Sequence, residues 1–162
     1  MTIRPARPRD AACIAAIYNH YVTTSVITFE EEPVTDAEIG RRIASVESAL
    51  LPWLVAEEGG RVTGYAYATP WRTRSAYRFS VEITAYVGQG WERRGIGSLL
   101  YDQILPLLKA RGIHAVLGGI ALPNAASVAL HEKFGFRKAA EFHEVGFKAN
   151  RWIDVGYWQL TL

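Results

Sequence analysis

The sequence predicts a mixed α/β domain built on one central sheet. Residues 80–87 alternate between polar and apolar side chains, as a strand with one buried face does. Residues 96–108 instead carry leucine and isoleucine at helical spacing. Two further apolar segments, 53–56 and 62–68, flank a turn that contains two glycines, which is typical of a β-hairpin. Strands and helices that follow one another in this way favour a sheet covered by helices.

The N-terminal part contributes an edge strand, two helices and a loop. Residues 2–4 form a short strand, and residues 9–21 carry one apolar stripe of a helix. Residues 22–33 are predicted to form a loop. Thr35 and Glu38 form a capping box that begins a second helix.

The C-terminal part alternates between loops, strands and one helix. Residues 70–78 form a polar loop rich in arginine and aromatic side chains, and residues 114–122 form a buried strand. Asn124 caps a helix that ends at Gly135. The last two strands are residues 136–147 and 152–160.

Length and composition limit the class of protein. The 162 residues are enough for one domain, which we expect to span residues 1–162, and the 49% apolar content excludes disorder. The net charge of +2 comes from basic residues that are spread along the chain, whereas a nucleic-acid-binding protein would show a basic stripe. No apolar run approaches the length of a membrane span, and no signal segment is evident. We therefore expect a soluble cytoplasmic protein that binds neither nucleic acid nor membrane.

Cysteine and histidine give no sign of a disulfide or a metal site. Cys13 is the only cysteine, and we expect it to pack against the first helix as a small apolar residue. The four histidines are far apart in the sequence and form no pair with ligand spacing. No metal is therefore expected.

A loop with two glycines joins the strand at 80–87 to the helix that follows it. Its sequence is Trp91-Glu92-Arg93-Arg94-Gly95-Ile96-Gly97-Ser98. Such a loop can direct several backbone N–H groups at one anion, and the helix N-terminus adds partial positive charge. The loop lacks Gly-Lys-Ser/Thr, and Leu100 stands where a dinucleotide fingerprint has its third glycine. The alternative is an ordinary strand-to-helix connection that happens to contain two glycines.

The segment Arg93-Arg94-Gly95-Ile96-Gly97 resembles the acetyl-CoA loop of the GNAT acetyltransferases, whose pattern is Gln/Arg-x-x-Gly-x-Gly/Ala. Glu92 departs from that pattern, since Gln or Arg is usual there. The resemblance implies a GNAT-like twisted mixed sheet flanked by helices and splayed between its fourth and fifth strands, with acetyl-CoA in the splay. The residues that it implies for acetyl-CoA binding are Ala85, Tyr86, Val87, Arg93, Arg94, Gly95, Ile96, Gly97, Ser98, Asn124, Ser127 and Lys133.

The helix that begins after Asn124 resembles a second GNAT segment, Asn-x-x-Ala-x-x-Leu-Tyr-x-x-x-Gly-Phe. Here Ser127 replaces the alanine and His131 replaces the tyrosine. In the family, that tyrosine can protonate the departing thiolate. Imidazole titrates near neutrality and is able to do the same, so His131 is a candidate general acid. The alternative is that His131 only packs or forms a structural hydrogen bond.

Glu82 is the candidate catalytic base. Strand alternation places it on one face with Thr84 and Tyr86, away from the apolar face of Val81 and Ile83. It follows a loop with three arginines, so it is either a surface ion-pair partner or a base beside an anion-binding pocket. Its place on the strand that leads into the glycine loop favours the second interpretation.

Three segments resemble the phosphinothricin and methionine sulfoximine N-acetyltransferase branch of that family: residues 28–30, residues 71–82 and the helix at 124–136. The resemblance implies transfer of an acetyl group to the primary amine of a small amino-acid-like acceptor, with Glu82 as the base, by a homodimer. Two alternatives are a GNAT enzyme for another amine, such as a protein N-terminus, a polyamine or an aminoglycoside, and a non-catalytic CoA-binding module. The residues implied for acceptor binding are Phe29, Trp71, Arg72, Thr73, Arg74, Tyr77, Arg78, Glu82 and Thr84.

Overall fold

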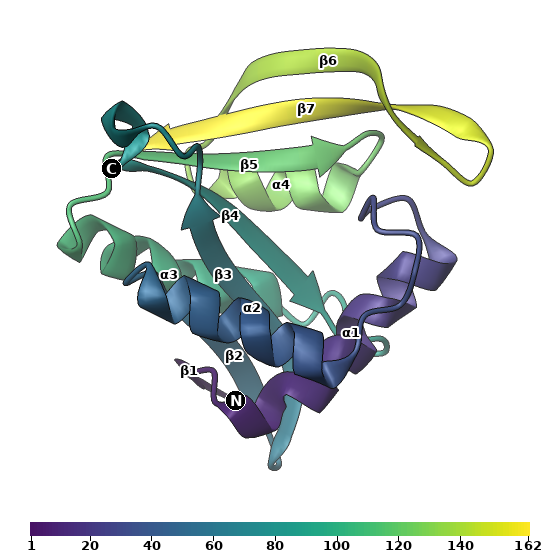
Figure 1. Cartoon of the computed structure of the whole chain (residues 1–162), viewed down its shortest axis with the longest axis vertical. Helices are drawn as coiled ribbons and strands as arrows, with labels where there is room; N and C mark the ends of the chain where they lie inside the picture. Colours follow the sequence, from purple (N-terminus) through teal and green to yellow (C-terminus); the bar gives the residue numbers. More distant parts are fainter.

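The computed structural model describes residues 1–162 and contains one seven-stranded sheet with four α-helices (Figure 1). The strand order is β1-β2-β3-β4-β5-β7-β6, and only the neighbours β4 and β5 are parallel. The strands are β1 (Thr2–Pro5), β2 (Trp53–Glu58), β3 (Arg61–Pro70), β4 (Ser80–Val87), β5 (Ala115–Ala121), β6 (Arg137–Lys148) and β7 (Arg151–Thr161). The helices are α1 (Ala11–Thr24), α2 (Asp36–Ser48), α3 (Ile96–Ala110) and α4 (Ala125–Lys133).

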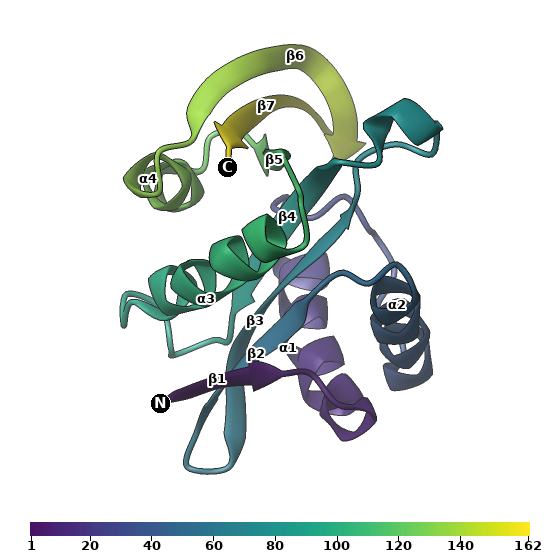
Figure 2. The same cartoon turned by 90° about the vertical axis from the view of Figure 1, so that its left-hand side faces the viewer.

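Two apolar cores lie on opposite faces of the sheet. Helices α1 and α2 cover one face, where Ile14 and Ile39 pack against β2 and β3. Helix α3 covers the other face, where Leu100 and Ile104 pack against strands β2 to β5 (Figure 2). Helix α4 lies on the α3 side and covers the C-terminal strands.

The sheet opens between β4 and β5. These two strands pair only at Ser80 with Ala115, at Val81 with Val116 and at Glu82 with Leu117. Beyond these pairs the strands diverge, as Figure 1 shows, while β4 stays paired with β3 and β5 stays paired with β7. The edge of β4 that faces β5 is therefore free of a neighbouring strand after Glu82. The predicted mixed fold and its splay between the fourth and fifth strands are confirmed.

Local sequence signals set most element boundaries. The hydroxyl of Thr35 accepts a hydrogen bond from the amide of Glu38 and caps α2. The Glu38 carboxylate binds the arginines at positions 41 and 42, so the second half of the predicted capping box is not formed. The expectation that Cys13 packs inside was wrong: its side chain is exposed, because the buried stripe of α1 uses other positions. None of the helices is both long enough and apolar enough to cross a bilayer.

Candidate active site

A cavity of about 720 Å³ lies where β4 and β5 part. Strands β3, β4, β5, β6 and β7 provide its floor and walls, and the segment after α1 contributes the remaining side. The lining is mostly apolar, and its polar side chains other than tyrosine are Thr28, Arg72, Glu82, Thr84 and Gln159. The aromatic side chains of the lining are Phe29, Tyr67, Trp71, Tyr86, Phe142 and Tyr157.

Glu82 is the last residue of β4 that pairs with β5, and it lines the cavity. Its face is the predicted one, because Thr84 also lines the cavity while Val81 and Ile83 are buried in the core. Glu82 is half-buried, and its carboxylate makes no hydrogen bond or ion pair. Burial raises the pKa of Glu82 above that of an ordinary glutamate. An unpaired carboxylate of raised pKa in a cleft has the properties of a general base.

The predicted acceptor-binding arginines separate into two groups. Arg72 lines the cavity, and its guanidinium lies 5.1 Å from the centre of the Trp71 ring without an ion-pair partner. Arg74 lies outside the cavity, in a neighbouring groove. Arg78 lies in that groove too, and its guanidinium lies 4.4 Å from the centre of the Phe79 ring. Of the residues expected to bind the acceptor, Phe29, Trp71, Arg72, Glu82 and Thr84 line the cavity. Thr73, Arg74, Tyr77 and Arg78 do not, and they line adjoining grooves that Arg72 also lines.

Phe29 reaches the cavity because the ammonium group of Lys148 holds its loop. Lys148 is the last residue of β6 and is buried, and its Nζ donates to the backbone carbonyls of Val22, Thr28 and Glu30 at 2.8, 2.8 and 2.7 Å. Three carbonyl acceptors use the three N–H bonds of the ammonium group. The loop that carries Phe29 is therefore fastened to the β6–β7 hairpin.

The glycine loop, called the cradle below, leaves backbone amides unpaired at the start of α3. Gly95 adopts φ 78° as the residue before the helix, and the first amide of α3 that donates to a preceding carbonyl is that of Leu99, to the carbonyl of Gly95 at 3.0 Å. The amides of residues 96–98 have no carbonyl partner within the helix. Glu92, which departs from the family pattern, accepts a hydrogen bond from the amide of Gly90 at 2.8 Å. Its carboxylate therefore has a structural partner within the loop.

Helix α4 lies beside this cradle. The ammonium of Lys133 donates to the hydroxyl of Ser98 at 2.9 Å, and a Cβ atom on Gly97 would lie 3.0 Å from Cδ2 of Leu130. Asn124 caps α4 by accepting from the amide of Ser127 at 3.1 Å. The residues predicted to bind acetyl-CoA on the loop and on α4 thus meet on one side of the splay. A small cavity there is lined by Ala85, Tyr86, Asn124, Ser127 and His131, among others, and it shares Thr84, Tyr86 and Gly119 with the large cavity.

This fold and site correspond to a known family. A model described as "Acetyltransferase (GNAT) domain" matches residues 3–156. The chain belongs to the GNAT acetyltransferase family. The expected acetyltransferase is thereby confirmed at the level of the family.

Relatives of this GNAT acetyltransferase include two curated enzymes. The chain is 43% identical to phosphinothricin N-acetyltransferase of Streptomyces viridochromogenes, over 97% of this chain and 85% of the relative. It is 37% identical to L-methionine sulfoximine/L-methionine sulfone acetyltransferase of Salmonella typhimurium, over 100% of this chain and 95% of the relative. The resemblance to this branch is thereby confirmed.

Two solved structures are also close to the GNAT chain. One is a phosphinothricin acetyltransferase from Sinorhizobium meliloti in complex with acetyl-CoA; it has a TM-score of 0.96 and 35% identity, with 99% of this chain and 88% of that chain covered. The other is a ribosomal-protein-alanine N-acetyltransferase from Brucella melitensis, with a TM-score of 0.98, 33% identity and full coverage of both chains. The fold is therefore shared by enzymes named for different acceptors.

His131 is buried with both ring nitrogens occupied. Its Nδ1 lies 2.8 Å from the carbonyl oxygen of Ser127, and its Nε2 lies 3.0 Å from the hydroxyl of Tyr101. Because a carbonyl only accepts, Nδ1 carries the proton, and the Tyr101 hydroxyl donates to Nε2. Burial lowers the pKa of His131, so the neutral ring is favoured. This arrangement favours the packing role, and protonation of the thiolate by His131 stays a prediction.

The site also contains residues that the sequence did not single out. Tyr157 of β7 lines the cavity, and its ring centre lies 5.3 Å from that of Trp71. Gly119 of β5 and Phe142 of β6 line it as well. The only sequence signal was alternation along β7, which places Val155 and Tyr157 on one face, but alternation does not reveal which strand lies alongside β4.

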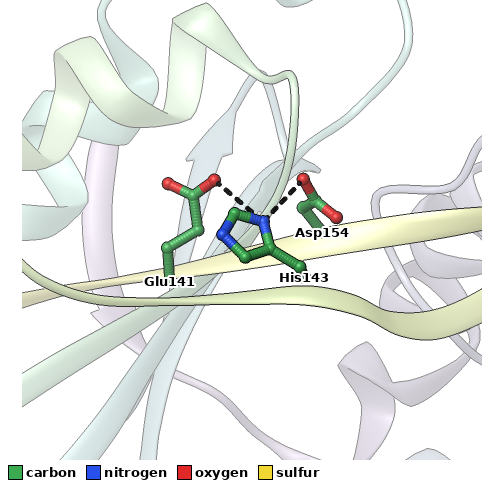
Figure 3. Close-up of side chains that lie close together, drawn as sticks. All are labelled: Glu141, His143 and Asp154. Carbon is green, nitrogen blue, oxygen red and sulfur yellow. Dashed lines mark hydrogen bonds and ion pairs between the residues drawn. The ribbon is translucent and has the colours of Figure 1, made fainter.

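The outer face of the β6–β7 hairpin carries a cluster of Glu141, His143 and Asp154 (Figure 3). Nδ1 of His143 lies 3.4 Å from Asp154 and 3.8 Å from Glu141. Asp154 also accepts from the amide of Glu144, which sits in a bulge of β6 with φ 52°. The contacts of these three side chains are with one another and with the bulge. They stabilise the bulge next to Val145, which lines the large cavity.

Proposed function

We propose that this GNAT acetyltransferase transfers the acetyl group of acetyl-CoA to the primary amine of a small amino-acid-like acceptor such as phosphinothricin or methionine sulfoximine. The observation that carries the proposal is the unpaired, half-buried carboxylate of Glu82 at the splay, in a cavity that Arg72 also lines. The names of the two curated relatives support the choice of acceptor.

The cavity suits an amino-acid-like acceptor in size and charge. Its volume of about 720 Å³ lies within the usual range for small-molecule pockets. Arg72 has no ion-pair partner, and its guanidinium is therefore free to bind a carboxylate or phosphinate with two hydrogen bonds. The aromatic walls exclude water around the carbon chain of the acceptor.

Glu82 prepares the amine for attack. An ammonium has no lone pair, so the acceptor loses a proton to Glu82, directly or through one water. The free amine forms the new N–C bond to the acetyl carbonyl carbon, and the C–S bond breaks. The departing thiolate takes a proton from solvent or from His131. We place the developing oxyanion near the backbone of Val87. The hydroxyl of Tyr21 donates to the carbonyl of Val87 at 2.6 Å and so holds this part of the backbone in position.

The cradle and α4 form the donor side of the site, where acetyl-CoA, the acetyl donor, would bind. The free amides of residues 96–98, with Arg93 and Arg94, would hold a pyrophosphate. The open edge of β4 at residues 85–87 would pair with the amide groups of the pantetheine arm. Asn124, Ser127 and Lys133 line the same side.

The second candidate acceptor is a protein N-terminus, which the name of the Brucella melitensis structure favours. A panel assay with acetyl-CoA and a thiol reagent separates the two. The amines are phosphinothricin, methionine sulfoximine, spermidine, an aminoglycoside and a peptide that begins with alanine. We expect the largest kcat/KM with the first two. A preference for the peptide or for spermidine would reject the proposed acceptor class, and no thiol release with any amine would indicate a non-catalytic CoA-binding module.

The resemblance to the branch also leads us to propose that residues 1–162 act as one catalytic domain in a cytoplasmic homodimer. The exposed aromatic side chains Phe147 and Trp152, whose ring centres lie 4.8 Å apart near the end of the β6–β7 hairpin, support a contact between copies. Light scattering during gel filtration gives the mass in solution, and a mass of one chain would reject the dimer.

A further inference from the structure

Strand β5 carries two successive glycines where it leaves β4. Leu117 is the last residue paired with β4, and Gly118 and Gly119 follow it immediately. Because successive strand residues face opposite sides, one glycine faces α4 and the other faces the cavity. A Cβ atom on Gly118 would lie 2.1 Å from Nε2 of His131, and one on Gly119 would lie 2.9 Å from Oε1 of Glu82.

The Glu82 carboxylate therefore occupies space that any other residue at position 119 would fill. A distance of 2.9 Å between a carbon and an oxygen is shorter than van der Waals contact, so one of the two atoms has to move. The same Cβ would lie 3.0 Å from Cε1 of Tyr157. The Tyr157 ring is held between Trp71 and Phe142, whereas the Glu82 carboxylate has no hydrogen bond to hold it. The Glu82 carboxylate is thus the group that would move away from the added Cβ atom.

We propose that Gly119 is a positioning residue for the catalytic base: the absence of a side chain at this position allows the Glu82 carboxylate to rest against β5 and face the acceptor amine. This inference rests on the proposed function, in which Glu82 removes a proton from the amine. Gly119 acts through Glu82 and not by contact with the acceptor. A displacement of about 1 Å can cost roughly a hundredfold in rate, so the position of a base matters as much as its presence.

A double-mutant cycle of Gly119→Ala and Glu82→Ala tests this coupling with phosphinothricin as the amine. Alone, Gly119→Ala should lower kcat/KM for the amine roughly ten- to a hundredfold and leave the affinity for acetyl-CoA within about twofold. In the Glu82→Ala background it should change kcat/KM by less than about twofold, because no carboxylate is left to displace. The contact with Tyr157 is present in both backgrounds and cancels in the comparison. Gly40→Ala is the matched control, because a Cβ on Gly40 of α2 meets nothing within 4 Å.

Each outcome of the cycle has one meaning. Equal losses from Gly119→Ala in both backgrounds, with Glu82→Ala itself impaired, would overturn the inference and leave the proposed function intact. A fully active Glu82→Ala would overturn the proposed base and the inference together. If Gly119→Ala melts too low for an assay, melting temperatures serve instead. Addition of Glu82→Ala should then restore the melting temperature, and a failure to restore it would overturn the inference.

Discussion

Two titratable groups beside the splay, the half-buried Glu82 and the buried His131, differ in how many hydrogen bonds their polar atoms make. His131 is buried and Glu82 is half-buried at the cavity, and desolvation shifts the pKa of each toward its neutral form. His131 has a partner at each ring nitrogen, in Ser127 and Tyr101. Glu82 has none at either oxygen.

This difference separates a structural group from a reactive one. The Glu82 carboxylate faces the cavity without a protein partner, so its lone pairs are available to a ligand or a proton. A buried group with all its hydrogen bonds made stabilises the fold and has no free lone pair to offer. On this basis we expect Glu82 to take the proton of the amine, and we expect the substitutions below to test whether His131 packs or donates a proton.

Removal of the Glu82 charge should produce the largest effect. Glu82→Gln keeps the shape of the side chain and removes its basicity, so kcat/KM for the amine should fall by about a hundred- to ten-thousandfold. Calorimetry should give nearly unchanged affinity for acetyl-CoA. The wild-type rate should rise as the pH passes through the raised pKa of Glu82, and the variant should lose that rise. A variant with near wild-type kcat/KM at every pH would show that Glu82 is not the base.

The two arginines of the polar loop should differ in the same assay. Arg72 lines the cavity, so Arg72→Ala should raise KM for the amine by roughly tenfold or more and change kcat less, as the loss of a charged hydrogen bond would. Arg74 lies in the neighbouring groove, so Arg74→Ala should raise KM less than about twofold. Equal effects of the two substitutions would contradict the separation of the arginines.

His131→Ala should lower stability more than rate. The substitution removes two hydrogen bonds and leaves a cavity, which together cost about 2–4 kcal/mol in the free energy of unfolding. We expect kcat per folded molecule to stay within about threefold of the wild type, since only large drops would mark a general acid. Denaturant unfolding and kinetics on one preparation measure both quantities. A hundredfold lower kcat with unchanged stability would make His131 the proton donor to the thiolate.

The smallest expected effect concerns stability near Glu82. Because folding raises the pKa of Glu82, the folded state holds its proton more tightly, and stability falls as pH rises above the unfolded value of about 4.5. The Gln side chain of Glu82→Gln does not ionise, so the variant does not lose stability in this way as the pH rises. It should melt higher than the wild type at pH 8, by a few degrees if the penalty is about 1 kcal/mol, and the difference should shrink toward pH 4. A lower melting temperature at pH 8 would show that the folded state favours the charged carboxylate.

The sequence predicted the parts of the site that depend on near neighbours. The face of Glu82 follows from strand alternation, the cradle from the glycines at 95 and 97, and the cap at Asn124 from one side chain. Such features involve residues a few positions apart, so local patterns specify them.

The rest of the site depends on the order of the strands. Tyr157 and Gly119 reach the cavity because β7 lies beside β5 and β5 meets β4. Nothing in the local pattern of β7 identifies its neighbour. The polar loop is a similar case: a short 3-10 turn at Ser75–Tyr77 precedes Arg78, which lines an adjoining groove and not the cavity, and the sequence pattern does not show this.

The Lys148 contact has a consequence for the order in which the two sides of the site form. The cradle is local, since its loop and α3 are adjacent in the chain. The acceptor cavity instead closes only when residue 148 reaches carbonyls 118 to 126 positions earlier. Contacts that span most of a chain form late, because they require closure of a long loop. A nascent chain therefore completes its donor side before its acceptor side, and only the finished chain has a closed acceptor cavity.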